Sequence, residues 1–244
     1  MNAQNDDSTL VRKVALRAGV LYLLIALIAP IGIIYVPSKL FIPANAVATA
    51  AAIQDSEWLL RLGMASELIH QAIEVFLSLV LYRLFKPVQE QWAKQMLVLC
   101  LIPIPIMFLN TVNEVGAVVV LGGYSFLSPF TAPQLDVLAY LFMRLHGAGI
   151  TVATVFWGLW LLPLSALLFR ARFGSRVVGV LAALAGTAYV VDALTKITLP
   201  QASQWASMLT TPAEAAELAV IAWLLYVGVR RSPNGVAAAT GSAA

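Results

Sequence analysis

The sequence predicts an all-α membrane protein with six transmembrane helices in a single bundle and both termini on the cytoplasmic side. Three observations support this prediction: an excess of apolar residues, six long apolar stretches and an uneven distribution of basic residues. Of the 244 residues, 61% are hydrophobic and 11% are charged, and the mean hydropathy is +0.87. A water-soluble domain carries about 45–50% apolar and about 25% charged residues. The interior of a soluble protein of this length cannot hold so many apolar residues, so the surrounding solvent is lipid. This composition excludes a cytosolic enzyme, a disordered chain and a nucleic-acid binder.

Six stretches are long and apolar enough to cross a hydrocarbon core, which takes about 20 helical residues. They comprise residues 14–36, 62–85, 96–121, 145–169, 177–199 and 213–229. They divide the chain into an N-terminal segment 1–13, a transmembrane domain 14–229 and a tail 230–244, which we expect to be disordered. The alanine-rich residues 45–55 are expected to form a short helix. Residues 132–144 either extend the fourth span or lie in the membrane interface.

The basic residues predict the orientation of the spans in a cytoplasmic (inner) membrane. On one side of the predicted spans lie Arg12, Lys13, Arg17, Arg83, Lys86, Lys94, Arg170, Arg172, Arg176, Arg230 and Arg231. On the other side lie Lys39, Arg61, Arg144 and Lys196. Because cytoplasmic loops carry the excess of Lys and Arg, both termini are placed in the cytoplasm.

Four prolines lie inside the predicted spans, at positions 30, 103, 105 and 163. Each frees a backbone carbonyl and favours a kink. We expect the pair in the third span to bend its cytoplasmic half.

Ionisable and amide side chains inside the spans are the informative residues for function. The second span contains Glu67, His70, Gln71 and Glu74; later spans contribute Asn110, Asn113, Glu114, His146, Asp192 and Glu217. At 100° per residue, Glu67, Gln71 and Glu74 share one helix face, with His70 at its edge. Four acids facing lipid would cost on the order of 10 kcal/mol, comparable to the stability of a domain. The pattern therefore predicts one polar cavity that opens outward and has its floor near Glu74 and Asn110.

Structural roles compete with functional ones at several of these positions. Thr211 and Glu214 flank a proline in the spacing of a capping box, which would begin the last span. Lys196 follows Asp192 by one helical turn, as in a local ion pair. The stripe on the second span is also compatible with an interhelical hydrogen-bond network that specifies packing.

The leading hypothesis is acid/base or metal-assisted chemistry on a hydrophobic, lipid-like or isoprenoid substrate, because a carboxyl group in a low-dielectric cavity can serve as a proton donor. Glu74 and Glu67 would be donor and acceptor, with Glu114 and Asp192 as further candidate catalytic groups. Candidate binding residues are Gln71, Asn110, Asn113 and Glu217. The Glu67-x-x-His70 spacing resembles a metal-ligand pair, so His70 and His146 are candidate ligands of zinc or iron.

Two other classes of function remain open. A proton-coupled transporter or small-ligand-binding protein would use the same residues as a proton relay or as binding groups. Transporter sites usually lie at the midplane between inverted repeats, and no repeat is visible in this sequence. The third class is a structural or accessory subunit, and no feature of the sequence specifically indicates it.

Several motifs resemble a known family. They are Leu81-Tyr82-Arg83-Leu84-Phe85-Lys86-Pro87-Val88, His146-Gly147, Phe156-Trp157-Gly158-Leu159, Gly179-Val180-Leu181 with Gly186, Tyr189 and Asp192, and Glu217 with Trp223-Leu224-Leu225. They are similar to the uncharacterised bacterial membrane proteins of domain of unknown function 4386, from Arg17 to Val229. The turn at Phe173-Gly174-Ser175-Arg176 lacks the proline that relatives often have. The resemblance implies a six-helix integral membrane protein and no established activity.

Overall fold

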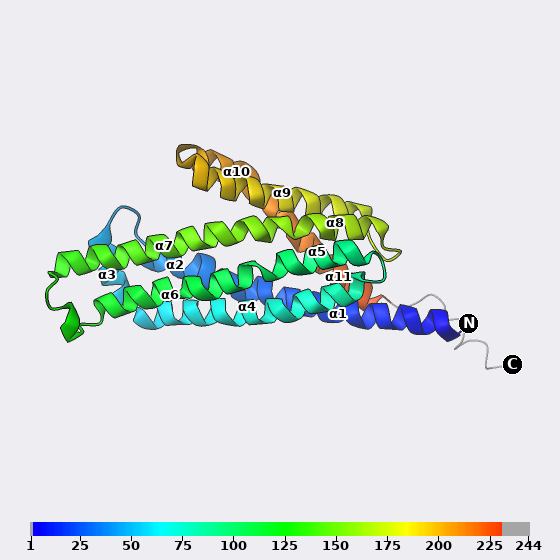
Figure 1. The fold of residues 1–244 in the computed structure, drawn as a ribbon, viewed down its shortest axis with the longest axis horizontal. Coiled ribbons are helices and arrows are strands. Elements are labelled where there is room, and N and C mark those ends of the chain that lie inside the picture. Colours follow the sequence, from blue (N-terminus) through cyan, green and yellow to red (C-terminus); the bar gives the residue numbers. More distant parts are fainter. Residues whose placement is uncertain (1, 231–244) are drawn as a thin grey trace.

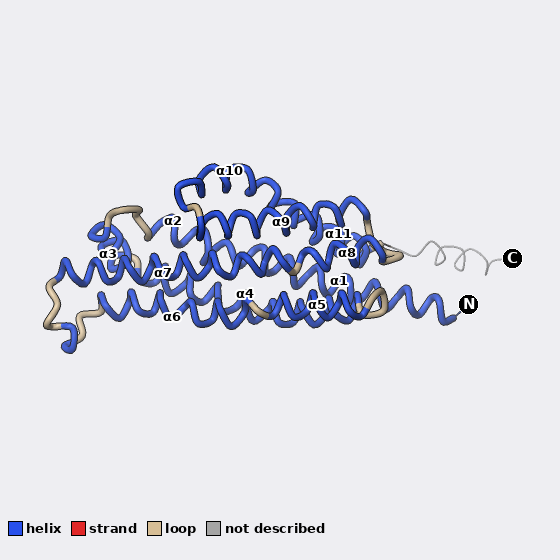
Figure 2. The backbone as a smooth tube through the Cα atoms, turned by 45° about the horizontal axis from the view of Figure 1, so that its top comes forward, coloured by secondary structure: helices blue, strands red, loops and turns tan. Residues whose placement is uncertain are grey.

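The computed structural model describes residues 2–230, with side chains described from Thr9 onward. Within this range, six helical segments are long and apolar enough to cross a membrane, and no strand forms (Figure 2). The predicted all-α bundle of six spans is confirmed. Residues 231–244, to which most of the predicted tail belongs, lie outside the described part of the chain.

The helices of the first three spans and the segment between the first two have the following bounds. Span one comprises α1 (Asn2–Pro30), the π-helix η1 (Ile31–Tyr35) and α2 (Val36–Leu40); α3 (Ala46–Asp55) follows; span two is α4 (Glu57–Phe85); span three comprises α5 (Glu90–Leu101) and α6 (Pro103–Leu121). Helix α3 confirms the short helix expected in the alanine-rich segment, and the Asn45 side chain caps its first turn.

The second half of the chain continues the bundle. It comprises η2 (Ser125–Leu127), α7 (Ala132–Leu159), α8 (Leu161–Arg170), α9 (Arg176–Thr198), η3 (Pro200–Ala202), α10 (Ser203–Glu214), η4 (Ala215–Glu217) and α11 (Leu218–Val229). Residues 132–144 belong to α7, so they extend the helix of the fourth span. A capping box at Thr131 begins this helix, since Thr131 and Gln134 satisfy each other's backbone N–H groups.

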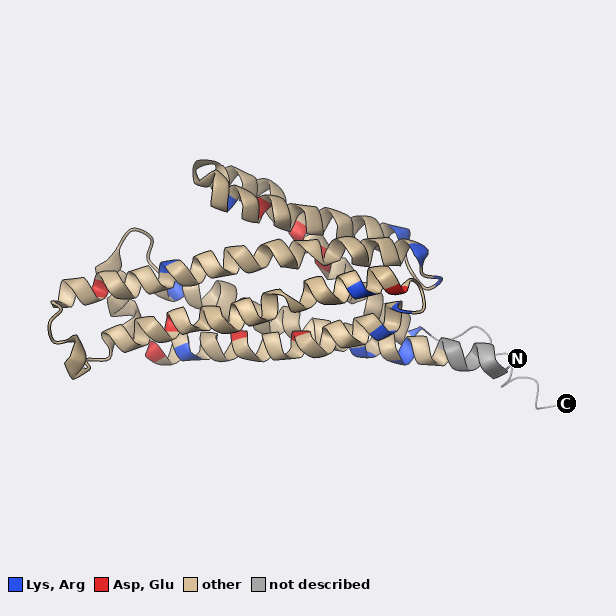
Figure 3. Ribbon diagram, viewed as in Figure 1, with Lys and Arg blue, Asp and Glu red and all other residues tan. Residues whose placement is uncertain are grey.

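The long helices run lengthwise through the bundle (Figure 1). Helix α6 packs against α7, α1 against α4 and α11, and α9 against α7, α8 and α10. The hairpin of α9 and α10 ends short of the far ends of α6 and α7, where α3 packs against α7. Lys and Arg residues gather at the end of the bundle where α1 begins and α8 ends (Figure 3).

Four of the six spans are interrupted. Proline accounts for three of the interruptions: η1 follows Pro30, α6 begins at Pro103, and α8 begins two residues before Pro163. The break between α5 and α6 confirms the interruption expected from the proline pair in the third span. Each break leaves backbone groups that neighbouring helices or side chains must satisfy.

The fourth interruption lies in the last span and corrects a prediction. Thr211 does not begin a helix, because α10 starts at Ser203 and continues through Pro212 to Glu214. The Thr211 hydroxyl instead donates to the carbonyl of Ser207, at 2.7 Å, as a mid-helix threonine does. The capping-box interpretation was therefore wrong, and the helix is interrupted later, at η4, where the chain passes from its contact with α9 to its contact with α1.

Two apolar clusters hold the bundle together. One surrounds Leu81, Phe85 and Leu164 near the end where α1 begins, and the other surrounds Leu60 and Met143 near α3. Along α4, α6 and α7, the buried polar side chains lie between these two clusters. The fold thus contains a polar layer enclosed by apolar packing at both ends.

Candidate functional site

The polar stripe of α4 lies in the interior of the protein. Glu67, His70, Gln71, Glu74 and Ser78 are all buried, with exposed fractions of 7% or less. Their spacing directs them to one side of a helix that contacts α1, α5 and α6. Burial on this scale agrees with the expectation that the acids do not face lipid.

Three residues from three helices form the most compact group in this layer. Glu67 of α4, Glu114 of α6 and His146 of α7 each place one potential ligand atom within 4.8 Å of the other two. The His146 Nε2 atom lies 3.2 Å from a Glu67 oxygen, and its Nδ1 atom lies 4.0 Å from a Glu114 oxygen. All three side chains are at most 2% exposed. The imidazole is therefore enclosed between two carboxyl groups.

Asn110 positions the imidazole of His146. Its Nδ2 atom donates to the His146 carbonyl at 2.9 Å and lies 3.2 Å from the ring Nδ1. Asn113 in turn donates to the Asn110 Oδ1 atom at 3.1 Å. Gly149 makes this arrangement possible, because a Cβ atom there would lie 2.0 Å from the Asn110 Oδ1 atom.

The π-helix η1 covers Glu67 from the side of α1. A Cβ atom at Gly32 would lie 2.7 Å from the Glu67 Cγ atom, from the Ser66 hydroxyl and from the Gly63 carbonyl. Only glycine allows this close approach of the two backbones. Single-turn π-helices inside α-helical segments occur frequently at functional sites.

His70 does not join the group formed by Glu67, Glu114 and His146. Its Nδ1 atom lies 3.1 Å from the Ser66 carbonyl, to which it donates, and its Nε2 atom lies 2.9 Å from the Gln71 amide nitrogen. Both ring nitrogens thus have partners on α4 itself. The two residues of the Glu-x-x-His pattern lie in different surroundings, and His70 contributes no ligand atom to the three-residue group.

A cavity of about 630 Å³ lies farther along α4, beside His70 and Glu74, between α1, α7, α9 and the broken last span. Most of its wall is apolar, including Ile25, Trp157 and Ile221. Its ionisable lining residues are His70, Glu74, Tyr22, Tyr189, Asp192, Lys196, Glu214 and Glu217. Neither Glu67 nor Asn110 lines it. The prediction of a single cavity with its floor at Glu74 and Asn110 is therefore corrected: the polar residues divide into an enclosed group and a separate cavity, and α4 contributes to both.

The carboxyl groups of the cavity differ in their partners. Glu217 accepts hydrogen bonds from the hydroxyls of Tyr22 and Tyr189, the latter at 2.8 Å. Glu74 has only the thiol of Cys100, which lies 3.8 Å from its Oε1 atom. The cavity therefore presents one carboxyl group held by two hydroxyl donors and one in largely apolar surroundings.

Asp192 is engaged by two neighbours. Lys196 donates to it at 2.5 Å, which confirms the predicted ion pair one helical turn apart, and the Ser207 hydroxyl of α10 donates to its other oxygen at 2.5 Å. The second contact ties α10 to α9.

A family model described as a domain of unknown function (DUF4386) matches residues 17–228. The chain belongs to this family. No curated protein and no solved structure matches the chain. The DUF4386 match covers both the three-residue group and the cavity, and it assigns neither of them a function.

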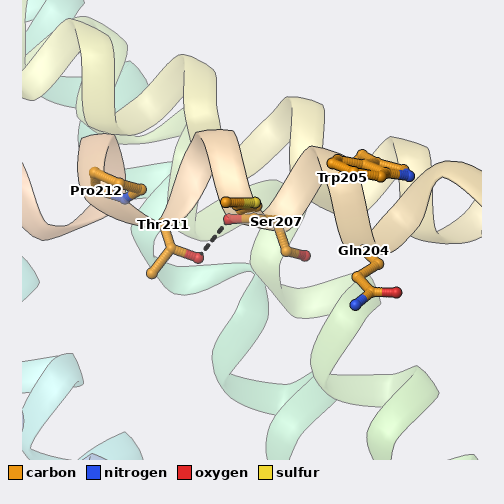
Figure 4. Close-up of a pocket in the computed structure, with 6 residues that line it drawn as sticks. Gln204, Trp205, Ser207, Thr211 and Pro212 are labelled. Atoms are coloured by element: carbon orange, nitrogen blue, oxygen red, sulfur yellow. Dashed lines mark hydrogen bonds between the residues drawn. The ribbon is translucent and has the colours of Figure 1, made fainter.

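A second hollow of this DUF4386 chain, of about 560 Å³, lies along α10 (Figure 4). Its lining residues all come from one helix: Gln204, Trp205, Ser207, Met208, Thr211 and Pro212. No ionisable side chain is among them, and Trp205 is 72% exposed. It is a groove on the surface of α10 and has no groups for acid/base chemistry.

Sequence reasoning did not select Tyr22, Tyr189, Cys100, Ser207 or Gly149 as site residues. A signal existed for the two tyrosines, since a buried Tyr hydroxyl usually finds a hydrogen-bond partner. Their partner, Glu217, comes from a third helix. Spacing along one helix cannot reveal that pairing.

Proposed function

We propose that the protein binds a hydrophobic, lipid-like molecule in the cavity and carries out acid/base chemistry on it. The observation that carries the proposal is the cavity itself, whose mostly apolar wall presents Glu74 and Glu217 from different helices. A volume of about 630 Å³ falls within the about 300–1,000 Å³ typical of small-molecule sites.

The two carboxyl groups suit different roles. Two hydroxyl donors stabilise a carboxylate at Glu217. Glu74 lacks donors of that strength, and its apolar surroundings suit a neutral acid that can deliver a proton. We assign Glu74 as general acid and Glu217 as the group that accepts a proton or orients a hydroxyl or amine of the substrate. Glu67 does not line the cavity, so it has no part in this assignment.

Charge distribution supports a cytoplasmic-membrane location with both termini on the cytoplasmic side. The basic residues gather at one end of the bundle (Figure 3), as positive-inside topology requires. In this orientation, the hairpin of α9 and α10 projects toward the outer side of the membrane.

The test uses the full chain in lipid nanodiscs with a photoactivatable long-chain alcohol and the matching long-chain amine as probes. We expect cross-links to peptides of α1, α4 and α7 that face the cavity. Incubation with a membrane lipid extract, followed by mass spectrometry, should reveal a product with the wild type and none with Glu74→Gln, while the probe still binds. Glu90→Gln is the matched control, because Glu90 is an exposed acid at the start of α5. Cross-links confined to other surfaces, or equal turnover by Glu74→Gln, would contradict the proposal.

Proton-coupled transport is a second candidate, favoured by one observation. The last span is discontinuous at η4, and Glu214 and Glu217 lie at this break and line the cavity. Discontinuous helices with polar groups form the substrate sites of many transporters. Proton flux into proteoliposomes that Glu217→Gln abolishes, without any lipid product, would favour transport over catalysis.

A further inference from the structure

The enclosed group of Glu67, Glu114 and His146 has buried polar atoms whose surroundings a packing network does not explain. Within the described part of the chain, both oxygens of each glutamate and the Nε2 atom of His146 make no hydrogen bond, although they are buried. Buried polar groups in native proteins are almost always hydrogen-bonded, and exceptions call for a specific cause such as an ion. Five buried atoms without a hydrogen bond at the junction of three helices form such an exception.

The geometry agrees with a shared ligand. The Nε2 atom of His146 and the Oε1 atom of Glu67 lie 3.2 Å apart, at ion-pair distance. Two atoms that bind one ion tetrahedrally at about 2.0–2.2 Å are separated by about 3.4 Å. The Glu114 carboxyl group lies slightly farther away, with all three ligand atoms within 4.8 Å.

The charge of the group is compatible with a bound divalent cation. Two carboxylates and a protonated imidazole would leave a net negative charge with no other cationic side chain in the group. Two carboxylates, a neutral imidazole and a divalent cation are neutral together. Neutrality matters here, because the group lies between apolar clusters within the membrane span.

The neighbours of the group hold its side chains in place. The Asn110 amide donates to the His146 carbonyl and so fixes the backbone that carries the imidazole. Outer-shell hydrogen bonds position the ligands of metal sites. Gly149 provides the space for that amide, and Gly32 of η1 closes the other side against Glu67.

We propose that Glu67, Glu114 and His146 bind a divalent first-row transition metal ion, with one imidazole nitrogen and two carboxylates as protein ligands. Imidazole nitrogen and carboxylate oxygen atoms are both ligands that Zn²⁺ and Fe²⁺ take in proteins. The site lies outside the cavity, so the proposal does not depend on the proposed chemistry there.

The experiment measures metal content in the purified, tag-free full-length chain. Inductively coupled plasma mass spectrometry of the wild type should find about one zinc or iron ion per chain, as a site with three protein ligands requires. Chelator treatment should lower the Tm, and one equivalent of the same metal should restore it. The Co²⁺-substituted protein should show the visible d–d absorption of a low-symmetry site.

Variants assign the ligands. His146→Ala and Glu114→Gln should each lower metal content at least about tenfold, since loss of even an outer-shell partner costs 10–100-fold in affinity. His70→Ala is the matched control, because His70 is the other histidine of the chain and is equally buried; it should keep the metal. Should His146→Ala not fold, the isosteric Glu114→Gln and the wild-type titration still decide the question. A wild type without bound metal that gains no Tm and no Co²⁺ spectrum on titration would overturn the proposal, as would His70→Ala losing the metal.

Discussion

Replacing Gly149 with alanine tests how the imidazole of His146 is held. The new Cβ atom would lie 2.0 Å from the Asn110 Oδ1 atom and 2.8 Å from its Nδ2 atom, so the Asn110 side chain has to move. Moving it breaks its hydrogen bond to the His146 carbonyl, its contact with the ring and the hydrogen bond from Asn113.

The structure supplies the magnitude. Three interactions at about 1 kcal/mol each amount to about 3 kcal/mol. Alanine has a helix propensity about 1 kcal/mol more favourable than glycine, which offsets part of the loss. We therefore expect Gly149→Ala to lower the free energy of unfolding by about 2 kcal/mol. For a chain of this size, that corresponds to a Tm lower by about 4–8 °C.

Gly147 provides a matched control two residues away on the same helix. A Cβ atom there would meet nothing within 4 Å. Thermal unfolding of both variants in the same detergent, followed by intrinsic tryptophan fluorescence, should show a lower Tm for Gly149→Ala and an unchanged or higher Tm for Gly147→Ala.

A double-mutant cycle isolates the cause. In an Asn110→Ala background, the clashing side chain is absent, so adding Gly149→Ala should cost almost nothing more. Equal destabilisation by Gly149→Ala in both backgrounds would refute the reasoning, as would a Tm for Gly149→Ala equal to that of Gly147→Ala.

Three further variants test other contacts. Gly186→Ala should lower stability by about 1–3 kcal/mol, because its Cβ atom would lie 2.7 Å from the Gly158 carbonyl of α7, a backbone atom that cannot move away; a normal Tm would show that the α7–α9 crossing is looser than described. Tyr189→Phe removes a hydroxyl donor from Glu217 and should cost about 1–3 kcal/mol, measured by chemical unfolding, whereas an unchanged midpoint would mean that the carboxyl group finds another donor. Thr131→Ala removes the capping box of α7 and should cost about 1 kcal/mol, with earlier hydrogen exchange at the start of that helix as the direct readout; unchanged exchange there would argue against the cap.

Much of the fold was predictable from the sequence because a membrane imposes strong local rules. Apolar runs located all six spans, and the prolines at 30, 103 and 163 marked three of the interruptions. The last span shows the limit of such rules. Thr211, Pro212 and Glu214 have the order of a helix start, yet Pro212 lies inside α10, because the helix had already begun at Ser203. A tertiary contact, the hydrogen bond from Ser207 to Asp192, holds α10 against α9 upstream of the proline.

The candidate site was predictable only in part, and for a physical reason. Spacing along α4 correctly predicted that Glu67 and Glu74 are buried, since facing lipid would cost about 2.5–3.5 kcal/mol for each. It did not predict that they serve different sites. That division depends on what the polar face of α4 meets at each point along the helix: Glu114 of α6 and His146 of α7 beside Glu67, and a cavity between α1, α7, α9 and the last span beside Glu74. Periodicity predicts which face of a helix is polar, and helix packing decides what that face contacts.

The π-helix η1 contacts both sites. On η1, Gly32 packs against Glu67, while Ile33 and Ile34 line the cavity. One short π-helix therefore contacts the enclosed group with one face and the cavity with another. A change of charge or occupancy at Glu67 would act on η1 through the contact with Gly32, because the Gly32 backbone lies directly against the Glu67 side chain. The two sites are separate in their chemistry but share this mechanical contact, and a substitution such as Gly32→Ala should affect both at once.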